Sequence, residues 1–171
     1  KLAHTGAEIM LTQVFTHGFY HGDPHPGNIL VTRDSSFCLL DCGAVGIIPD
    51  TLRFHIGVLL YGVVSKDNER IVRTLMRLSR RPIEDIRGLE FEVAELLEEY
   101  ASLPLKQIDI GQVMRRFARL VVEHNLEVIP RFYLLLKAAM TIESIGRRLD
   151  PDFNMIEQVE PYARKLIYRS P

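Results

Sequence analysis

Three polar side chains in the first quarter of the chain have the types and spacing that phosphate chemistry needs. Asp23 and Asn28 stand five positions apart in the loop HGDPHPGN of residues 21–28, and Asp41 opens the sequence DCG at 41–43. Two prolines and two glycines restrict the backbone of the loop, which is typical of a loop that holds side chains in one geometry. These two segments are the candidate functional site.

The three side chains suit the transfer of a phosphoryl group. Mg²⁺ prefers oxygen ligands and binds through one or two carboxylates together with phosphates and water, and Asn28 and Asp41 offer such oxygens. Asp23 is then left to orient or deprotonate a hydroxyl group or water. The order HxDxxxxN from His21, followed by DxG ending at Gly43, is that of protein-kinase catalytic and metal-binding loops. The sequence therefore predicts a site for Mg²⁺ and a nucleotide.

A small β-hairpin is the element that must bring these side chains together. Residues 29–31 and 37–40 are short β-type runs, and TRDSS at 32–36 between them has the composition of a turn. Such a hairpin returns Asp41 to the loop at 21–28. We expect polar loops on either side of the hairpin.

The rest of the sequence is helical in pattern. Apolar positions at helical spacing predict a helix over residues 2–17, with Gly18 as its left-handed C-terminal cap. After Pro49, further helices are expected to begin at four N-cap residues: Asp50, Asp67, Asp109 and Asn154. Pro130 suits the first turn of a helix that runs to about Arg148. The expected fold is mainly α, with about six or more helices and one small hairpin.

Composition places the chain among ordinary globular domains. It has 171 residues, 47% of them hydrophobic and 25% charged, with a net charge of −1. These values argue against disorder, a collagen-like repeat and a coiled-coil rod, and the balanced charge predicts no nucleic-acid partner. The longest uncharged stretch, residues 9–22, is too short to cross a bilayer, and no signal peptide is visible. We expect one domain over residues 1–171.

The two cysteines, Cys38 and Cys42, are separated by three residues. This spacing is not that of a CxxC pair, and no cation next to them in sequence marks either as reactive. We predict reduced, inert thiols in the core and hence a reducing compartment.

Residues 18–28 (GFYHGDPHPGN) resemble the catalytic loop of the UbiB family of atypical protein-kinase-like proteins, and residues 41–46 (DCGAVG) resemble its metal-binding loop. LDPDF at 149–153 is similar to a late signature of the same family. The resemblance spans essentially the whole chain and implies the helical C-terminal lobe of a kinase-like fold. The chain departs from the usual kinase pattern at Cys42, which replaces the Phe of DFG, and at Gly22, which replaces an Arg.

The resemblance also implies roles for the site residues. Asp23 corresponds to the catalytic aspartate, and His21 to the residue that braces its loop. Asn28 and Asp41 correspond to the Mg²⁺ ligands, which together with Gly43 hold the phosphates of ATP.

The activity implied by the resemblance is that of an atypical kinase or ATPase that uses Mg-ATP in support of ubiquinone biosynthesis. The implied partners are a nucleotide and, at a membrane, an anionic lipid or quinone-biosynthesis proteins. The implied location is the cytoplasmic face of a bacterial membrane or the matrix face of a mitochondrial one. Because only 22 residues precede Asp23, we expect this chain to lack a nucleotide-covering N-terminal lobe and any membrane tail, and to be inactive by itself.

Two other functions fit the same residues. A pseudokinase-like scaffold would bind a lipid or a protein partner without catalysing a reaction. A metal-dependent hydrolase would use the HxDxH pattern of His21, Asp23 and His25 as metal ligands. For His25 by itself, a ligand role and a loop-packing role are both open.

Three further groups of residues have both a structural and a functional interpretation. Four arginines at helical spacing have three interpretations: a solvated face, a contact for anionic lipid, or ion-pair partners of an acidic stripe on the next helical segment. The arginines are Arg70, Arg73, Arg77 and Arg80, and the acidic residues are Glu92, Glu95 and Glu99.

An apolar set is interpreted as core rather than as a lipid or quinone slot: Phe132, Leu135, Leu136 and Ala139. Three histidines are interpreted as helix-surface or core-edge residues: His17, His55 and His124.

Overall fold

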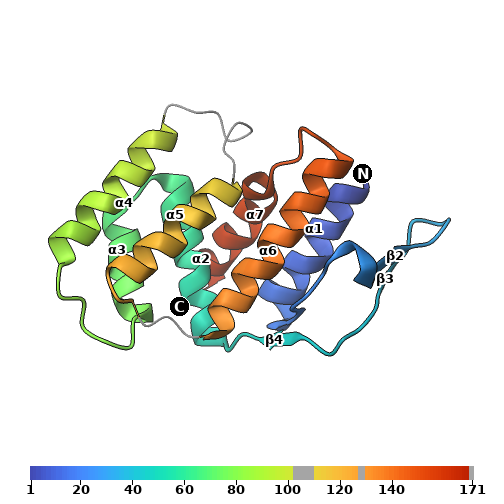
Figure 1. Ribbon diagram of the computed structural model, residues 1–171, viewed down its shortest axis with the longest axis horizontal. Coiled ribbons are helices and arrows are strands. Elements are labelled where there is room, and N and C mark those ends of the chain that lie inside the picture. The colour runs from blue at the N-terminus through green and yellow to red at the C-terminus, as the bar shows by residue number, and fades with distance from the viewer. Residues whose placement is uncertain (102–109, 127–129, 170–171) are drawn as a thin grey trace.

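The computed structural model describes residues 1–101, 110–126 and 130–169, which form seven α-helices and two small β-ribbons (Figure 1). The α-helices are α1 (Leu2–Thr12), α2 (Asp50–Ser65), α3 (Asn68–Leu78), α4 (Ile86–Ala101), α5 (Ile110–Glu123), α6 (Pro130–Leu149) and α7 (Met155–Arg169). The strands are β1 (Phe19–His21), β2 (Ile29–Val31), β3 (Phe37–Leu39) and β4 (Val45–Ile47). The mainly helical fold predicted from the sequence is confirmed.

The helices pack around a shared apolar core, and the ribbons lie at one end of it. α2 packs against α3 and α7, α1 packs against α6 and α7, and α5 contacts both α4 and α6. In Figure 1 the four strands lie beside α1 and the lower part of α6, on the opposite side of the molecule from α3 and α4. Within the described ranges, no helix combines the length and apolar character needed to cross a bilayer.

The first helix ends at Gly18, as the sequence predicts. The regular α-helix stops at Thr12, and a π-helical turn, Gln13–His17, continues it to the cap. Gly18 has φ 64°, and a Cβ atom there would lie 2.7 Å from the carbonyl oxygen of Ile48. Only glycine fits this position, because a side chain would meet both an unfavourable backbone conformation and a fixed backbone atom.

The predicted hairpin forms from β2 and β3, which pair antiparallel with Ile29 opposite Leu39. The polar loops expected on either side of it are only partly correct, because each contains a strand. β1 and β4 pair antiparallel, with Tyr20 opposite Gly46, and form a second ribbon. Each of these strands has three residues, too few to show a period of two, and the partners come together only when the hairpin between them has formed.

Two of the predicted N-caps are confirmed. The carboxylate of Asp67 accepts a hydrogen bond from the backbone N–H of Arg70, and this bond is the main cause that lowers the pKa of Asp67. Asn154 Oδ1 accepts from the backbone N–H groups of Ile156 and Glu157 at the start of α7. Both side chains satisfy amides that a helix end leaves without an internal partner.

The other predicted helix starts have different outcomes. Asp50 is the first helical residue of α2 rather than its N-cap, which is Pro49, and its carboxylate pairs with Arg53 one turn later. α6 begins at Pro130 and ends at Leu149, so its predicted limits are confirmed to within one residue. Asp109 lies outside the described residues.

The prediction of core cysteines is wrong. Cys38 and Cys42 are both free thiols and both are exposed. Cys38 is the central residue of β3, in a two-stranded ribbon that lies at the edge of the described part of the molecule (Figure 1). A β-type run in the sequence does not distinguish a strand buried on both faces from one in a surface ribbon.

The apolar set on α6 belongs to the core but does not fill it. Phe132 and Leu135 are buried, and Leu136 and Ala139 are packed against the core. All four line a cavity of about 460 Å³, which is bounded almost entirely by apolar side chains and takes residues from each of the seven described α-helices. The core interpretation is confirmed, and the cavity is a feature that helical spacing does not predict.

Candidate functional site

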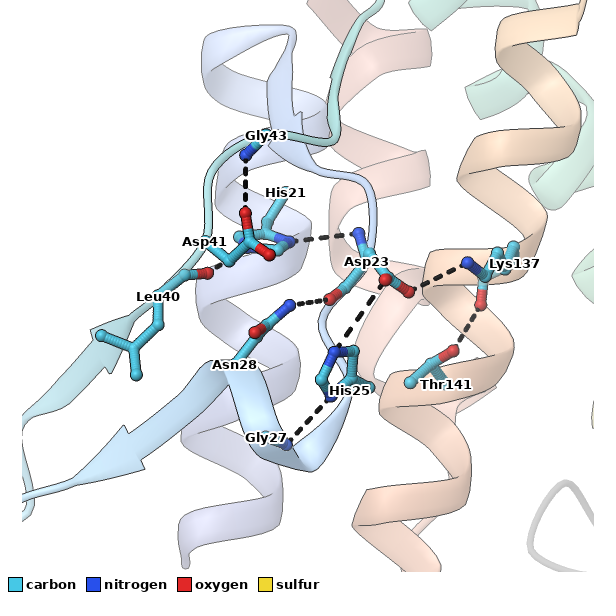
Figure 2. A network of polar contacts seen from close by, with 10 residues as sticks. All are labelled: His21, Asp23, His25, Gly27, Asn28, Leu40, Asp41, Gly43, Lys137 and Thr141. Atoms are coloured by element: carbon cyan, nitrogen blue, oxygen red, sulfur yellow. Dashed lines mark hydrogen bonds and ion pairs between the residues drawn. The ribbon is translucent and has the colours of Figure 1, made fainter.

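Hydrogen bonds to the backbone of Leu40 bring the two candidate segments together, and Figure 2 shows the one from the side chain of His21. The N–H of Leu40, just after β3, donates to the carbonyl oxygen of Asn28 at 2.8 Å. The carbonyl oxygen of Leu40 in turn accepts from Nε2 of His21 at 2.8 Å. Asp41 follows Leu40 directly, so the β2–β3 ribbon holds it against the loop that carries Asp23 and Asn28.

His21 is the brace of the loop in the structure. Its Nδ1 accepts a hydrogen bond from the backbone N–H of Asp23 at 3.1 Å, while its Nε2 donates to Leu40. These two bonds define the neutral tautomer with the proton on Nε2. Its own N–H donates to Gln13 Oε1 at 3.1 Å. The buried imidazole therefore joins the loop to the end of β3, and the backbone N–H of the same residue ties it to the π-helical turn.

Asn28 holds the loop closed from inside. Its side chain is buried, and Nδ2 donates to the carbonyl oxygen of Asp23 at 3.1 Å. This bond fixes the orientation of the amide and leaves its Oδ1 as an acceptor. At the loop's start, the N–H of Gly22 donates to the carbonyl oxygen of Ala44 at 2.7 Å, which ties the loop to the segment before β4.

Asp41 has an unusual backbone conformation. Its φ is 48°, in the left-handed region that aspartate tolerates better than most residues. One carboxylate oxygen, Oδ1, accepts from the backbone N–H of Gly43 at 3.3 Å, and the side chain is exposed. The DxG sequence thus forms a turn in which Gly43 orients the aspartate.

Lys137 on α6 contacts the central aspartate. Its Nζ donates to Asp23 Oδ1 at 2.9 Å, across 114 positions of sequence (Figure 2). The carboxylate is about 35% exposed and its Oδ2 lies 4.0 Å from Nε2 of His25. One oxygen of Asp23 is therefore held by an ammonium group, and the other faces the loop and solvent.

This contact strengthens the preference of Asp23 for its ionised form. The hydrogen bond from Lys137 is the main cause that lowers its pKa, partial burial acts in the opposite direction, and the charges of Lys137 and His25 lower the pKa further. At neutral pH Asp23 is therefore ionised. A carboxylate with a lowered pKa is a weak base, so it is suited to orienting a hydroxyl group and accepting the proton late in the reaction.

Lys137 is a site residue that the sequence interpretation missed. It is the only charged residue between Arg131 and Glu143 in an otherwise mostly apolar stretch. A single charged residue in such a stretch is expected to have an ion-pair partner when it is buried, so the pattern marks Lys137 as a residue to examine. It does not identify the partner.

His25 has a loop-packing role. Its Nδ1 accepts from the backbone N–H of Gly27 at 3.0 Å and so caps the short 3₁₀ turn Pro26–Asn28. The hydrolase alternative is not favoured, because both ring nitrogens of His21 are used by the backbone. In the part of the chain that the structure describes, no cluster of three His, Cys, Asp or Glu side chains is arranged to hold a metal ion.

Comparison with known protein families supports the kinase interpretation. The family model of the ABC1 atypical kinase-like domain matches residues 1–75, and that of the UbiB helical domain matches residues 93–154. Together they cover most of the chain. The chain belongs to the UbiB family of atypical kinases. No solved structure is a significant match to it.

The two matched regions meet at the site of this UbiB-family chain. Asp23, Asn28 and Asp41 lie in the region matched by the ABC1 atypical kinase-like domain, whereas Lys137 lies in the region matched by the UbiB helical domain. The bond between Lys137 and Asp23 therefore links the helical region to the kinase-like loop.

Two of the four arginines have local partners at α3, and Arg80 lies beyond the end of that helix. Arg70 bonds to Asp67 and lies 5.2 Å from the ring centre of Tyr61, and Arg73 pairs with Glu69. Among the described residues, the acidic stripe on α4 pairs elsewhere: Glu92 with His124 and Glu99 with Arg116. Pairing between the two stripes is therefore not observed, and a solvated face with local ion pairs describes the arginines best.

The three histidines interpreted as surface or core-edge residues occupy such positions. His17 is exposed at the end of the π-helical turn. His55 is half-buried, and burial, with a smaller contribution from Arg77, lowers its pKa. The nearly buried ring of His124 lies 3.2 Å from Glu92.

Proposed function

We propose that this chain carries the catalytic and metal-binding residues of an enzyme that transfers a phosphoryl group from Mg-ATP. The observation that supports this most directly is the network that holds Asp23, Asn28 and Asp41 around one loop (Figure 2). In phosphoryl transfer a protein chiefly positions the reactants and neutralises charge, and a rigid loop of oxygen-bearing side chains provides both.

Asn28 and Asp41 are the residues that fit Mg²⁺. The bond from Nδ2 of Asn28 to Asp23 leaves the amide oxygen of Asn28 as a donor to metal, and the bond from Gly43 to Asp41 leaves Oδ2. One amide oxygen and one carboxylate form the kind of small, hard ligand set that Mg²⁺ accepts beside phosphates and water. When bound there, the ion supplies positive charge to the nucleotide phosphates.

Asp23 is the residue that acts on the acceptor. Its ionised carboxylate accepts a hydrogen bond from the acceptor hydroxyl or water and directs the oxygen toward the γ-phosphorus. As the bond between the γ-phosphorus and its bridging oxygen breaks, the electron pair leaves with the nucleoside diphosphate and the acceptor proton passes to Asp23. His21 keeps the loop in place throughout, because neither of its ring nitrogens is available for the reaction.

The finer assignments rest on membership of the family. We extend the proposal to a role in ubiquinone biosynthesis at a membrane, with quinone-biosynthesis proteins or an anionic lipid as partners. Fold and family alone do not determine a substrate, so these assignments need their own tests.

Replacement of Asp41 tests the metal site. In the full-length protein, we expect Asp41→Asn to abolish Mg-nucleotide binding in isothermal titration calorimetry, because the variant loses the only carboxylate of the proposed ligand pair. Asp152→Asn, an exposed aspartate of the turn before α7, is the matched control and should bind as the wild type does. Undiminished binding by Asp41→Asn contradicts the proposal.

A further inference from the structure

An open groove of about 580 Å³ lies between α5 and α6 and reaches the catalytic loop at Pro26. Lys137, the partner of Asp23, is one of its lining residues. One end of the groove therefore lies at the lysine that contacts Asp23, and the groove extends away from it along α6.

The groove carries more positive than negative charge, because within the part of the chain that the structure describes only the ammonium group of Lys137 is paired, with Asp23. Three of its lining residues are cations, Arg115, Lys137 and Arg148, and none of the described residues that line it is acidic. Arg115 and Arg148 are exposed, and in the described ranges neither has a carboxylate within ion-pair distance. Guanidinium groups in this state favour an anion such as a phosphate or a carboxylate.

The side of the groove that α6 forms has a stripe of polar residues and, beside it, a stripe of apolar residues. Lys137, Thr141 and Arg148 follow the spacing i, i+4 and i+11, so they share a face of the helix. From Lys137 to Arg148 this stripe spans about 16 Å at 1.5 Å per residue. Leu136 and Met140 line the groove beside it and also line the apolar cavity. The groove thus combines cationic groups with an apolar floor.

The position of the groove relative to the metal ligands matches the geometry of phosphoryl transfer. Figure 2 shows Asn28 and Asp41 on one side of Asp23, and Lys137 and Thr141 on the other. The attacking and leaving oxygens of a transferred phosphoryl group lie roughly in line on opposite sides of the phosphorus. With the nucleotide on the metal side, the acceptor must approach from the side of the groove.

We propose that this groove binds the acceptor substrate through an anionic group, a phosphate or a carboxylate, held by Arg115 and Arg148. The apolar part of the acceptor lies against Leu136 and Met140, and its hydroxyl group reaches Asp23. The transfer itself rests on the function proposed above: the hydroxyl oxygen bonds to the γ-phosphorus of the nucleoside triphosphate, the nucleoside diphosphate leaves, and Asp23 takes the proton. Anion binding in the groove does not depend on that transfer.

Binding of hexyl phosphate to the full-length protein, measured by calorimetry without nucleotide or Mg²⁺, tests the proposal. We expect the double variant R115Q/R148Q to bind at least about tenfold more weakly than the wild type, because each charged hydrogen bond contributes about that factor or more. The control R77Q/R80Q removes two exposed arginines near α3 and should change the affinity less than about twofold. Both arginines of the groove are exposed, and circular dichroism verifies the fold of each variant.

Further arms distinguish the source of the anion. A lipid headgroup is identified if the wild-type protein sediments with phosphatidylglycerol vesicles but not with phosphatidylcholine vesicles. The double variant R115Q/R148Q should then no longer sediment with the phosphatidylglycerol vesicles. Binding of hexyl phosphate without vesicle binding identifies a free small acceptor, and both results support the groove. Equal affinity of wild type and R115Q/R148Q, equal affinity for hexanol and hexyl phosphate, or no binding of either probe overturns the proposal.

The outcomes for the groove and for the metal site are independent. If Asp41→Asn loses Mg-nucleotide binding but the groove variant retains hexyl phosphate, only the groove assignment fails. If the groove binds the anion as expected but Asp41→Asn retains Mg-nucleotide, the groove stands as an anion site and the proposed phosphoryl transfer fails.

Discussion

At the scale of single residues, the pKa and the hydrogen bonding of Asp23 depend on a contact from a distant helix. The ammonium group of Lys137 bonds to Oδ1, which leaves Oδ2 as the oxygen that can receive an acceptor hydroxyl. The same contact lowers the pKa of the carboxyl group. Lys137 therefore sets both the direction in which Asp23 acts and its strength as a base.

We predict that Lys137→Met raises the pKa of Asp23 towards its ordinary value of 3.8, because the variant removes the hydrogen bond and the charge that lower it. A carbon-13 NMR titration of the Asp23 carboxyl group measures the change. Lys165→Met, an exposed lysine on α7, is the control. If both variants titrate Asp23 as the wild type does, Lys137 is not the cause of the shift.

The same shift has a consequence for stability in acid. A carboxyl group with a lowered pKa in the folded state stabilises the protein fully above its unfolded pKa, and this stabilisation is lost as the pH falls through the folded pKa. Wild type should therefore lose more stability than Lys137→Met between pH 5 and the acid limit of the fold, as denaturant unfolding at a series of pH values would show.

His21 provides a second prediction at this scale. His21→Ala leaves the carbonyl oxygen of Leu40 and the N–H of Asp23 without their side-chain partner. We expect a loss of about 1–3 kcal/mol in the free energy of unfolding, the cost of an unsatisfied buried polar group. His17→Ala, at an exposed histidine, should change the free energy by less than about 0.5 kcal/mol. Equal urea midpoints for the two variants would show that the imidazole is not a brace.

At the scale of elements, two ribbons share the task of holding the loop. The β2–β3 ribbon returns Asp41 to the loop, and the β1–β4 ribbon fixes its entrance, since β1 ends at His21. Tyr20 of β1 is fully buried, and its ring occupies the space that a side chain at Gly46 of β4 would fill. A Cβ atom at Gly46 would lie 2.1 Å from this ring. The ring thus packs directly on the backbone of β4.

Gly46→Ala should therefore separate β1 from β4 and destabilise the protein by about 1–3 kcal/mol, as overpacking of a filled site does. Gly6→Ala on α1 is the matched control, because a Cβ atom there would meet only the ring of Phe37 at 3.6 Å. Its helix propensity predicts a gain of up to about 1 kcal/mol. Urea unfolding of the two variants measures both effects, and equal stabilities would contradict the packing described for Tyr20.

At the scale of the whole molecule, the helices border a cavity that their side chains do not fill. Apolar residues of all seven described α-helices line about 460 Å³, and an unfilled cavity costs stability because its walls lose packing contacts. Two of the lining residues, Leu136 and Met140, also line the acceptor groove. The cavity and the groove are thus neighbours that share part of α6.

Two adjacent alanines on α6 test the cavity. Ala139 lines it, whereas Ala138 is fully buried and is not part of its wall. We expect Ala139→Leu to stabilise the protein by about 0.5–2 kcal/mol through filling of the cavity. Ala138→Leu should destabilise it by about 1–3 kcal/mol through overpacking. If Ala139→Leu destabilises the protein as much as Ala138→Leu, the space is not available to a side chain.

Much of the fold and the central site could be predicted from the sequence because the information is local. Gly18, Asp67, Asn154 and Pro130 end or begin helices through preferences that act within one or two turns. The hairpin was recognisable from two β-type runs around a turn, and it returns Asp41 to the loop that carries Asp23. The kinase-like motif thus specified both the residues and the element that assembles them.

Other features were decided only by tertiary structure. Lys137 reaches Asp23 across 114 positions, β1 finds β4 beyond the hairpin, and Cys38 is exposed in a ribbon at the edge of the described part of the molecule. Each depends on the angles and distances at which whole helices pack, and these follow from the combined fit of many side chains rather than from any short segment. Local sequence determined the types and spacing of the candidate site residues, and packing decided which distant groups contact them.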